Sequence, residues 1–138
     1  MSKRVTFVGS RSPNAAEALD MLSEKYDAVD LDDAEIIVAL GGDGYMLEAI
    51  HRNMKRDLPI YGMNRGTVGF LLNSFETDDL MERLEKAQQV TITPLHMKVT
   101  TDSGIEQEDY AFNEVSLLRQ TRQAANLRVT IDGKTRIE

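Results

Sequence analysis

Residues 35–44 read EIIVALGGDG, an uninterrupted apolar run that ends in a glycine-rich tetrapeptide. A continuous run of β-branched and aliphatic residues is typical of a strand covered on both faces, as in a parallel sheet. When glycines follow such a strand and open a helix, free backbone N–H groups and the helix dipole favour a phosphate there. The stretch therefore predicts an α/β fold with a ligand site at the carboxyl end of a buried strand.

The flanking segments extend the α/β pattern in both directions. Short β-branched runs alternate with segments whose apolar residues recur at three- and four-residue spacing, which predicts strands and amphipathic helices in turn. We expect a Rossmann-like N-terminal domain with a parallel sheet. Its predicted elements are strands at residues 3–9, 28–31, 35–40 and 59–63, a helix capped by Ser12, a helix from Tyr45 to about Arg56, and a helix capped by Thr77.

The hydrophobic period changes from about 3.6 to 2 near Pro94, which predicts a domain boundary. We expect an α/β nucleotide-binding domain over residues 1–93 and the start of a β-rich second domain over residues 94–138. Turn signals at residues 102–104 and 132–133 predict hairpins, and only residues 134–138 follow the second turn. The last hairpin is therefore expected to be unfinished and the protein truncated. Exposed strand edges would favour a homo-oligomer, a dimer or tetramer.

Composition excludes several classes of protein. The 138 residues carry a net charge of −7 and contain no cysteine, which removes disulfides, zinc ribbons, iron–sulfur clusters and thiol nucleophiles. The negative charge disfavours non-specific binding to nucleic acid or anionic lipid. No apolar run approaches the roughly 18 residues of a membrane span. We expect a cytoplasmic protein without a nucleic-acid or membrane partner.

Glycine is concentrated in the part of the chain that contains the tetrapeptide. Six of the nine glycines fall within residues 41–69, which indicates backbone brought close to a ligand. Asp43 stands inside the first cluster, where a carboxylate would repel phosphate, so we expect it to face a hydroxyl group or Mg²⁺. A tight turn in which Asp43 caps the following helix is an equally good interpretation of this motif alone.

Other nucleotide and catalytic motifs are missing. The sequence contains no G-x-x-x-x-G-K-[ST] and no G-x-G-x-x-G after the first predicted strand, so neither a P-loop nor a dinucleotide-binding Rossmann unit is expected. The only histidines, His51 and His96, lack suitable partners at metal-ligand or triad spacing. Zinc hydrolysis and serine-type catalysis therefore lose support.

A second glycine-rich stretch, YGMNRGTVGFL at residues 61–71, follows the first by about twenty residues, and Asn113-Glu114 comes about fifty residues later. Together with Gly41–Gly44, these segments give the chain its resemblance to the NAD kinase family. The first motif is shared with lipid kinases and 6-phosphofructokinases, whereas the G-x-N-x-G-x-x-G-F-L pattern is much more specific. The resemblance implies a two-domain NAD kinase fold, of which this chain would be the N-terminal portion.

The resemblance also implies roles for the residues of the two glycine-rich segments. Asp43 matches the catalytic aspartate, taken as the general base toward the adenosine 2′-hydroxyl of NAD, with Gly42 and Gly44 beside it in the cofactor-binding loop. Phe70 and Leu71 match the segment that lines the NAD site. Phosphoryl transfer needs mainly positioning and charge stabilisation, and an ionised aspartate can orient the hydroxyl and accept its proton late in transfer.

Three further residues complete the predicted dinucleotide site. Asn113 and Glu114 match the Asn-Glu pair that holds the adenosine end of NAD, and Asn64 belongs to the second glycine-rich segment. An amide can donate and accept at base or ribose edges, while a carboxylate accepts from ribose hydroxyls. The implied phosphate donor is ATP, or polyphosphate in some relatives, used with Mg²⁺; no side chain is predicted as a metal ligand.

Two departures from the family pattern keep alternatives open. Glu48 stands where many relatives carry a basic residue, and among the nearby cations Arg65 is the one we expect to meet a phosphate. Relatives also continue well beyond the position that matches Glu138. The chain is therefore predicted to be an ATP-dependent NAD 2′-kinase, with a non-catalytic NAD- or ATP-binding fragment, or a lipid or sugar kinase of the same superfamily, as alternatives.

Overall fold

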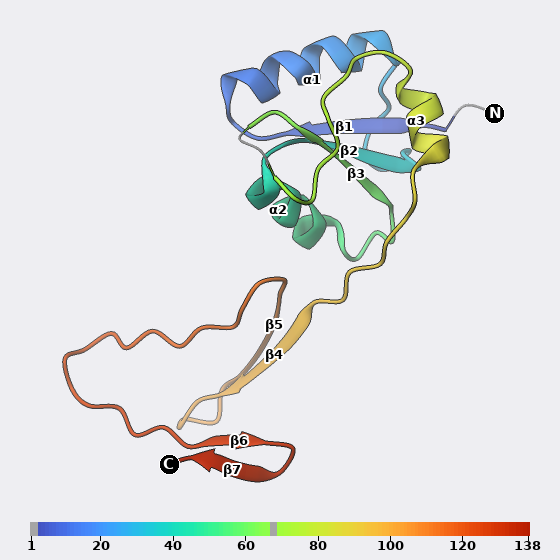
Figure 1. Cartoon of the computed structure of the whole chain (residues 1–138). Coiled ribbons are helices and arrows are strands. Elements are labelled where there is room, and N and C mark those ends of the chain that lie inside the picture. The colour runs from blue at the N-terminus through green and yellow to red at the C-terminus, as the bar shows by residue number, and fades with distance from the viewer. Residues whose placement is uncertain (1–2, 67–68) are drawn as a thin grey trace.

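The computed structural model describes residues 3–66 and 69–138, which form a three-stranded parallel sheet with helices, followed by two antiparallel hairpins (Figure 1). The elements of the first part are β1 (Val5–Gly9), α1 (Pro13–Lys25), β2 (Ile36–Gly41), α2 (Asp43–Asn53), β3 (Ile60–Asn64) and α3 (Leu80–Lys86). The second part contains β4 (Leu95–Thr100), β5 (Glu106–Ala111), β6 (Val129–Ile131) and β7 (Lys134–Ile137).

The parallel sheet has the strand order β1-β2-β3, so β2 is its central strand. All six residues of β2 are buried, and Val38 pairs in register with Phe7 on one side and Tyr61 on the other. Helices α1 and α3 contribute side chains to the core on one face of this sheet and α2 to the core on the other. The helices and the sheet form three layers (Figure 1). The predicted α/β class and the buried parallel strand are confirmed.

Helix α1 begins where the sequence predicted. Ser12 is the N-cap, its Oγ accepts a hydrogen bond from the N–H of Ala15 at 3.3 Å, and Pro13 occupies the first turn. The helix buries Ala15, Ala18 and Leu22 against the sheet, and the polar residues between them face solvent. Cap and periodicity together are sufficient to specify this element.

The strand predicted at residues 28–31 is wrong. The chain leaves α1 through Asp27, whose φ of 47° lies in the left-handed region, and reaches a turn at residues 31–33. Val29 donates one backbone hydrogen bond to Val5 at 3.0 Å, and the described structure assigns no strand there. One backbone hydrogen bond to β1 is not enough to form a β-ladder. The turn at residues 31–33 follows directly, so the chain does not run alongside β1 far enough to form more.

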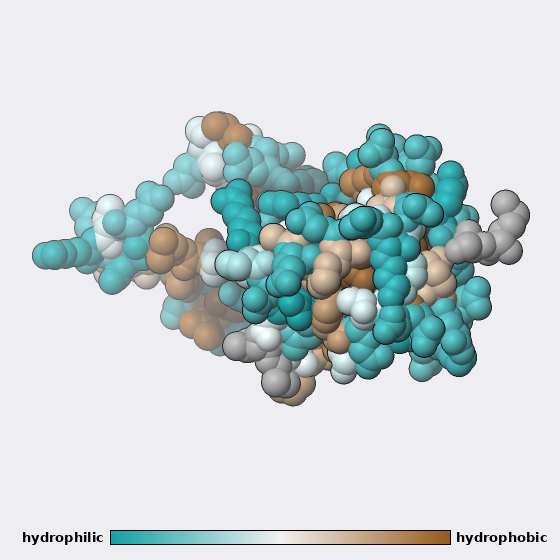
Figure 2. Space-filling model, turned by 90° about the horizontal axis from the view of Figure 1, so that it is seen from above, coloured by the Kyte–Doolittle hydropathy of each residue, from teal (hydrophilic) through white to brown (hydrophobic). Residues whose placement is uncertain are grey.

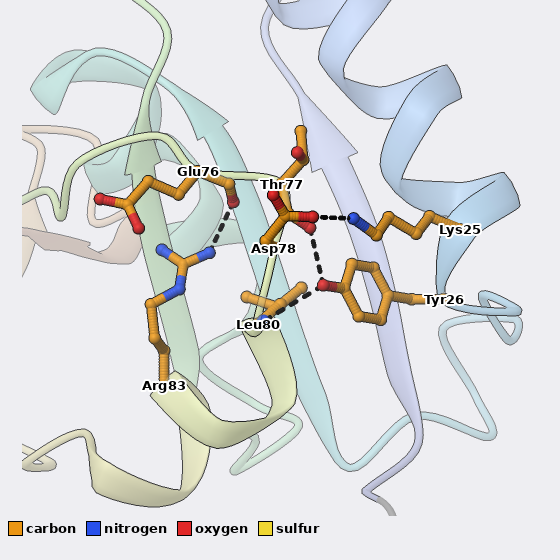
Figure 3. A network of polar contacts seen from close by, with 7 residues as sticks. All are labelled: Lys25, Tyr26, Glu76, Thr77, Asp78, Leu80 and Arg83. Carbon is orange, nitrogen blue, oxygen red and sulfur yellow. Dashed lines mark hydrogen bonds and ion pairs between the residues drawn. The ribbon is translucent and has the colours of Figure 1, made fainter.

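The predicted bounds of the other two helices also change. Helix α2 starts at Asp43 rather than Tyr45, because Gly42 in extended conformation is its N-cap. The helix ends at Asn53, before the predicted end near Arg56. Helix α3 starts at Leu80 with Asp79 at its N-cap, so the predicted Thr77 cap is wrong. The backbone carbonyl of Thr77 instead accepts a hydrogen bond from the hydroxyl of Tyr26 at 2.7 Å (Figure 3).

Both predicted turns of the second part form hairpins. Strands β4 and β5 pair in antiparallel fashion around Gly104, whose φ is 82°. Asp132 and Gly133, with φ of 49° and 75°, join β6 to β7, as a two-residue turn with positive φ at both positions requires. The expectation of an unfinished hairpin is wrong, because residues 134–137 suffice for a paired returning strand. The predicted boundary between residues 93 and 94 lies in the extended segment before β4.

Side chains after residue 94 are mostly exposed, and the apolar ones gather on no common core with the parallel sheet. Apolar residues reach the surface in the space-filling view (Figure 2). In residues 3–66 and 69–138, no helix has the length and apolar character needed to cross a bilayer.

Candidate functional site

The candidate site lies at the carboxyl end of β2, where Gly41 closes the strand and Gly42 caps α2. Gly42 has φ −102° and ψ −179°, and its carbonyl accepts the first helical hydrogen bond from Met46 at 3.0 Å. The N–H groups that precede this bond belong to the first turn of the helix, at its positive end. The prediction that the glycine cluster opens a helix at a strand's carboxyl end is confirmed.

The carboxylate of Asp43 joins the two glycine-rich segments. Its Oδ2 accepts a hydrogen bond from the backbone N–H of Phe70 at 2.8 Å, and its Oδ1 accepts one from the N–H of Leu71 at 3.0 Å. The side chain therefore points toward the segment at residues 69–71. The interpretation of Asp43 as a cap of its own helix is wrong, because Gly42 holds the N-cap position and Asp43 is the first residue of the helix.

Glycine at position 69 permits this contact. A Cβ atom on Gly69 would lie 2.3 Å from Asp43 Oδ1 and 2.6 Å from Asp43 Cγ, well inside van der Waals contact. Gly66 also approaches the first cluster, with its hypothetical Cβ 3.6 Å from the Cα of Gly42. The motif residues Thr67 and Val68 lie outside the described residues.

Asn64 and Arg65 shape the turn that leaves β3. Asn64 is the last residue of the strand, and its Oδ1 accepts a hydrogen bond from the N–H of Gly66 at 2.8 Å. The N–H of Arg65 donates to the carbonyl of Gly41 at 2.8 Å, so the two predicted motifs are joined through backbone as well. These bonds give Asn64 a conformational role beside its predicted cofactor-binding role.

The Arg65 side chain, which we expected to meet a phosphate, makes contacts inside the protein. Its Nε donates to the carbonyl of Asn14 at 3.1 Å, and its guanidinium carbon lies 4.1 Å from the centre of the Phe75 ring. A cation over an aromatic face is stabilised by the ring quadrupole. Arg65 therefore connects the turn after β3 to the first turn of α1.

Asn73 is a site-supporting residue that sequence reasoning missed. Its backbone N–H and its Nδ2 both donate to the carbonyl of Gly62, at 2.9 and 3.1 Å, and its carbonyl accepts from the N–H of Asn64 at 2.9 Å. These three bonds attach the end of the 69–71 segment to β3. In the sequence, only the position of Asn73, two residues after the G-F-L end of the motif, could have indicated this supporting role.

Phe70 and Leu71 present their side chains to solvent. Phe70 is fully exposed and Leu71 is 41% exposed. Exposing a large aromatic side chain beside a carboxylate provides a face on which a planar ring can stack. The site thus combines backbone N–H groups, one carboxylate and one free aromatic face.

Asn113 and Glu114 are exposed residues that follow β5. Among the described residues no contact links this pair to Asp43 or to the 69–71 segment. The end of β5 instead contacts the last turn of α2, where His51 Nε2 lies 3.2 Å from the carbonyl of Tyr110 and the His51 ring meets Phe112 edge to face. The structure therefore brings Gly42, Asp43, Asn64, Phe70 and Leu71 together and leaves Asn113 and Glu114 apart.

A groove of about 1040 Å³ runs from the 69–71 segment along α2 and β3 to the end of β5. Its lining is mixed: the apolar and aromatic side chains include Met46, Ile50, Phe70, Leu71, Tyr110 and Phe112, and the polar ones include Asn53, Lys55 and Asp57. In the first turn of α2, partial burial raises the pKa of the Tyr45 hydroxyl above its ordinary value of 10.0.

The part of the chain that the structure describes contains no group of three or more acidic, histidine or cysteine side chains placed to hold a metal ion. The described residues therefore do not fit a protein-built Mg²⁺ cage, which requires several oxygen ligands in octahedral geometry.

Comparison with known proteins gives one consistent result. The family described as "ATP-NAD kinase N-terminal domain" matches residues 4–92. An NAD kinase of Cereibacter sphaeroides is 48% identical over 136 residues, which are 99% of this chain and 54% of that protein. NAD kinases of Hyphomonas neptunium and Xanthomonas campestris are 45% and 47% identical, over 98% and 97% of this chain and 53% of each relative. The chain thus spans about half the length of the curated relatives it matches.

Proposed function

The chain belongs to the NAD kinase family, and on this basis we propose that it serves to transfer the terminal phosphoryl group of ATP to the adenosine 2′-hydroxyl of NAD, which yields NADP. The observation that carries the proposal is the Asp43 carboxylate, fixed by the N–H groups of Phe70 and Leu71 where α2 begins. A general base and a phosphate-binding helix terminus then lie side by side.

In the proposed reaction, the 2′-oxygen of NAD forms a bond to the terminal phosphorus of ATP as the bond between that phosphorus and ADP breaks. Asp43 orients the 2′-hydroxyl and takes its proton late in the transfer. The backbone around Gly42 and Gly44 meets phosphate oxygens with N–H groups of the first turn. Mg²⁺ would come bound to the ATP phosphates and offset their charge, since no cage of side chains fits it here.

The dinucleotide would be held by residues on both sides of Asp43. Phe70 and Leu71 offer exposed apolar surface for a ring of NAD, and Asn64 maintains the turn below them. We assign Asn113 and Glu114 to the adenosine end, on the family resemblance. This assignment requires the segment after β5 to approach Asp43 when NAD binds.

The test is NADP formation from NAD, ATP and Mg²⁺, measured with an NADP-specific dehydrogenase. It is run on the chain and on a chimera that adds the remaining half of the Cereibacter sphaeroides relative. We expect Asp43→Asn to reduce turnover by at least a hundredfold, because general-base catalysis contributes roughly 10²–10⁴-fold. Asp20→Asn, on the exposed face of α1, is the matched control. Equal turnover in Asp43→Asn and the unaltered protein would remove the assigned role.

A second candidate function is binding of NAD or ATP without transfer. It is favoured by one observation, the separation of Asn113 and Glu114 from Asp43 within the described residues. This function predicts saturable binding of NAD by the 138-residue chain in calorimetry, with no NADP formed by the chain or by the chimera.

Three further features belong to the same proposal. We propose a cytoplasmic protein, since a chain without cysteine does not depend on an oxidising compartment. We propose a homo-oligomer, because apolar residues of the hairpins, among them Leu95 and Ile137, are exposed. Light scattering after size exclusion tests this, with a monomer as the contradicting result. We retain domains at residues 1–93 and 94–138, and limited proteolysis should cut between α3 and β4.

A further inference from the structure

We propose that the backbone N–H groups of Phe70 and Leu71 position the Asp43 carboxylate for catalysis. Glycine at position 69 is required because any side chain there would displace this carboxylate. The inference rests on the proposed function. It adds Gly69 as a positioning residue and gives the 69–71 backbone a task distinct from lining the NAD site.

The two hydrogen bonds fix the orientation of the carboxylate. Each oxygen of Asp43 receives one N–H, at 2.8 and 3.0 Å, from consecutive residues of one segment. Bonds from two donors to the two oxygens of a charged group restrict its rotation and are stronger than bonds between neutral groups. A carboxylate offers about four lone-pair sites, so lone pairs remain on both oxygens for a substrate hydroxyl. The carboxylate can thus be held and still accept a proton.

The chain just beyond the 69–71 segment has its own attachment to β3. Asn73 attaches the end of this segment to β3 through two hydrogen bonds to the Gly62 carbonyl and one from the Asn64 N–H. A segment that is anchored independently can serve as a fixed reference for a side chain from another element. The bonds at Asp43 therefore act on the carboxylate more than on the segment.

Gly69 is constrained by the carboxylate and not by its own backbone. Its φ lies outside the range of +20° to +160°, so alanine could adopt the same conformation. A Cβ at this position would lie 2.3 Å from Oδ1 and 2.8 Å from Oδ2 of Asp43. The methyl group and the carboxylate cannot both keep their places, and the side chain with rotatable bonds has to move.

The first part of the test is kinetic. We expect Gly69→Ala to lower kcat for NADP formation by about 10²-fold, because misplacing a reacting group by about 1 Å costs about a hundredfold in rate. The KM for NAD should change by less than about threefold. Gly66→Ala adds a methyl group to the same glycine-rich stretch at a position where the nearest atom is 3.6 Å away, and kcat should fall far less. Full kcat in Gly69→Ala, or an equal loss in Gly66→Ala, would overturn the inference.

The second part does not depend on activity. Amide hydrogen exchange, followed by NMR on the 138-residue chain, should show protected N–H groups at Phe70 and Leu71. In Asp43→Ala both should exchange at least tenfold faster, and in Asp43→Asn one of the two, since an amide retains one acceptor oxygen. The Asn73 N–H is the internal reference and should not change. Unchanged exchange in Asp43→Ala overturns the positioning contact, whereas protected amides with no NADP formation by the chain or the chimera overturn the proposed function.

Discussion

The hydroxyl of Tyr26 accepts a hydrogen bond from the backbone N–H of Leu80 at 3.1 Å and thereby caps a helix that lies 54 residues further along the chain (Figure 3). Leu80 is the first residue of α3, and its own N-cap residue, Asp79, makes no side-chain bond there. The same hydroxyl donates to the carbonyl of Thr77 at 2.7 Å. One side chain at the end of α1 therefore satisfies the first backbone N–H of α3.

Tyr26→Phe should destabilise the protein by about 1–2 kcal/mol, because it leaves a partly buried N–H and a carbonyl without their partner. The measurement is the free energy of unfolding from urea titration. Tyr61→Phe is the matched control, since no hydrogen bond joins the Tyr61 hydroxyl to the part of the chain that the structure describes. An equal loss in the two variants would show that the Tyr26 hydroxyl has no capping role.

The neighbouring contact between Lys25 and Asp78 should make stability depend on pH at both ends of the scale (Figure 3). The hydrogen bond from Lys25, followed by its charge, holds the pKa of Asp78 below its ordinary value of 3.8, and the bond to Asp78 holds the pKa of Lys25 above 10.5. A lowered acid pKa stabilises the fold above pH 3.8 and the effect is lost as the pH falls through the folded value. A raised lysine pKa stabilises below pH 10.5 and is lost as the pH rises through its folded value.

The difference in unfolding free energy between the unaltered chain and Asp78→Asn should accordingly be constant at intermediate pH and shrink below pH 3.8 and above pH 10.5. Both side chains are partly solvent-exposed, so we expect a small difference. Asp20→Asn should show no such profile. A difference that does not vary with pH would contradict the assignment.

Leu22→Ala should destabilise the protein by about 2–5 kcal/mol, because a fully buried leucine leaves a cavity between α1 and the sheet when it is truncated. Met21→Ala is the control on the same helix, since Met21 is 42% exposed. Its expected cost is less than about 1 kcal/mol. Similar denaturation midpoints for the two variants would contradict the burial pattern of α1.

Gly62→Ala should destabilise the protein by about 1–3 kcal/mol through overpacking. Gly62 is buried in β3, and a Cβ there would lie 2.4 Å from Leu72 Cδ2 and 2.9 Å from Met46 Sδ. Gly66→Ala, which has no contact closer than 3.6 Å, should cost less. The measurement is the thermal unfolding of both variants. A Gly62→Ala chain as stable as the unaltered one would contradict the predicted overpacking.

The candidate site could be predicted in part. The G-G-D-G tetrapeptide after an apolar run located the helix terminus, and the G-F-L end of the second motif marked Phe70 and Leu71 as lining the NAD site. Only the structure shows that these two residues are partners of Asp43. The sequence did not reveal that these partners are backbone N–H groups, since every residue carries one. The role of Asn73 could not be predicted, because asparagine is common in loops and its bonds to Gly62 depend on the path of the chain between the two residues.

What the sequence determined by itself was local: the buried strand β2, the Ser12 cap of α1 and the turns at Gly104 and Asp132. Each depends on a few consecutive residues, because strand period, cap chemistry and positive φ act over short distances.

Tertiary structure decided the features that join distant segments. Helix α3 begins at Leu80, whose N–H binds the Tyr26 hydroxyl, and not after a cap at Thr77, and residues 28–31 form no strand. The contact of Asp43 with Phe70 and Leu71 exists only because β2 and β3 lie in parallel, which places their carboxyl ends at one edge of the sheet. Local signals carry no information about which distant groups will satisfy a hydrogen bond, since that depends on how the packed elements bring them together.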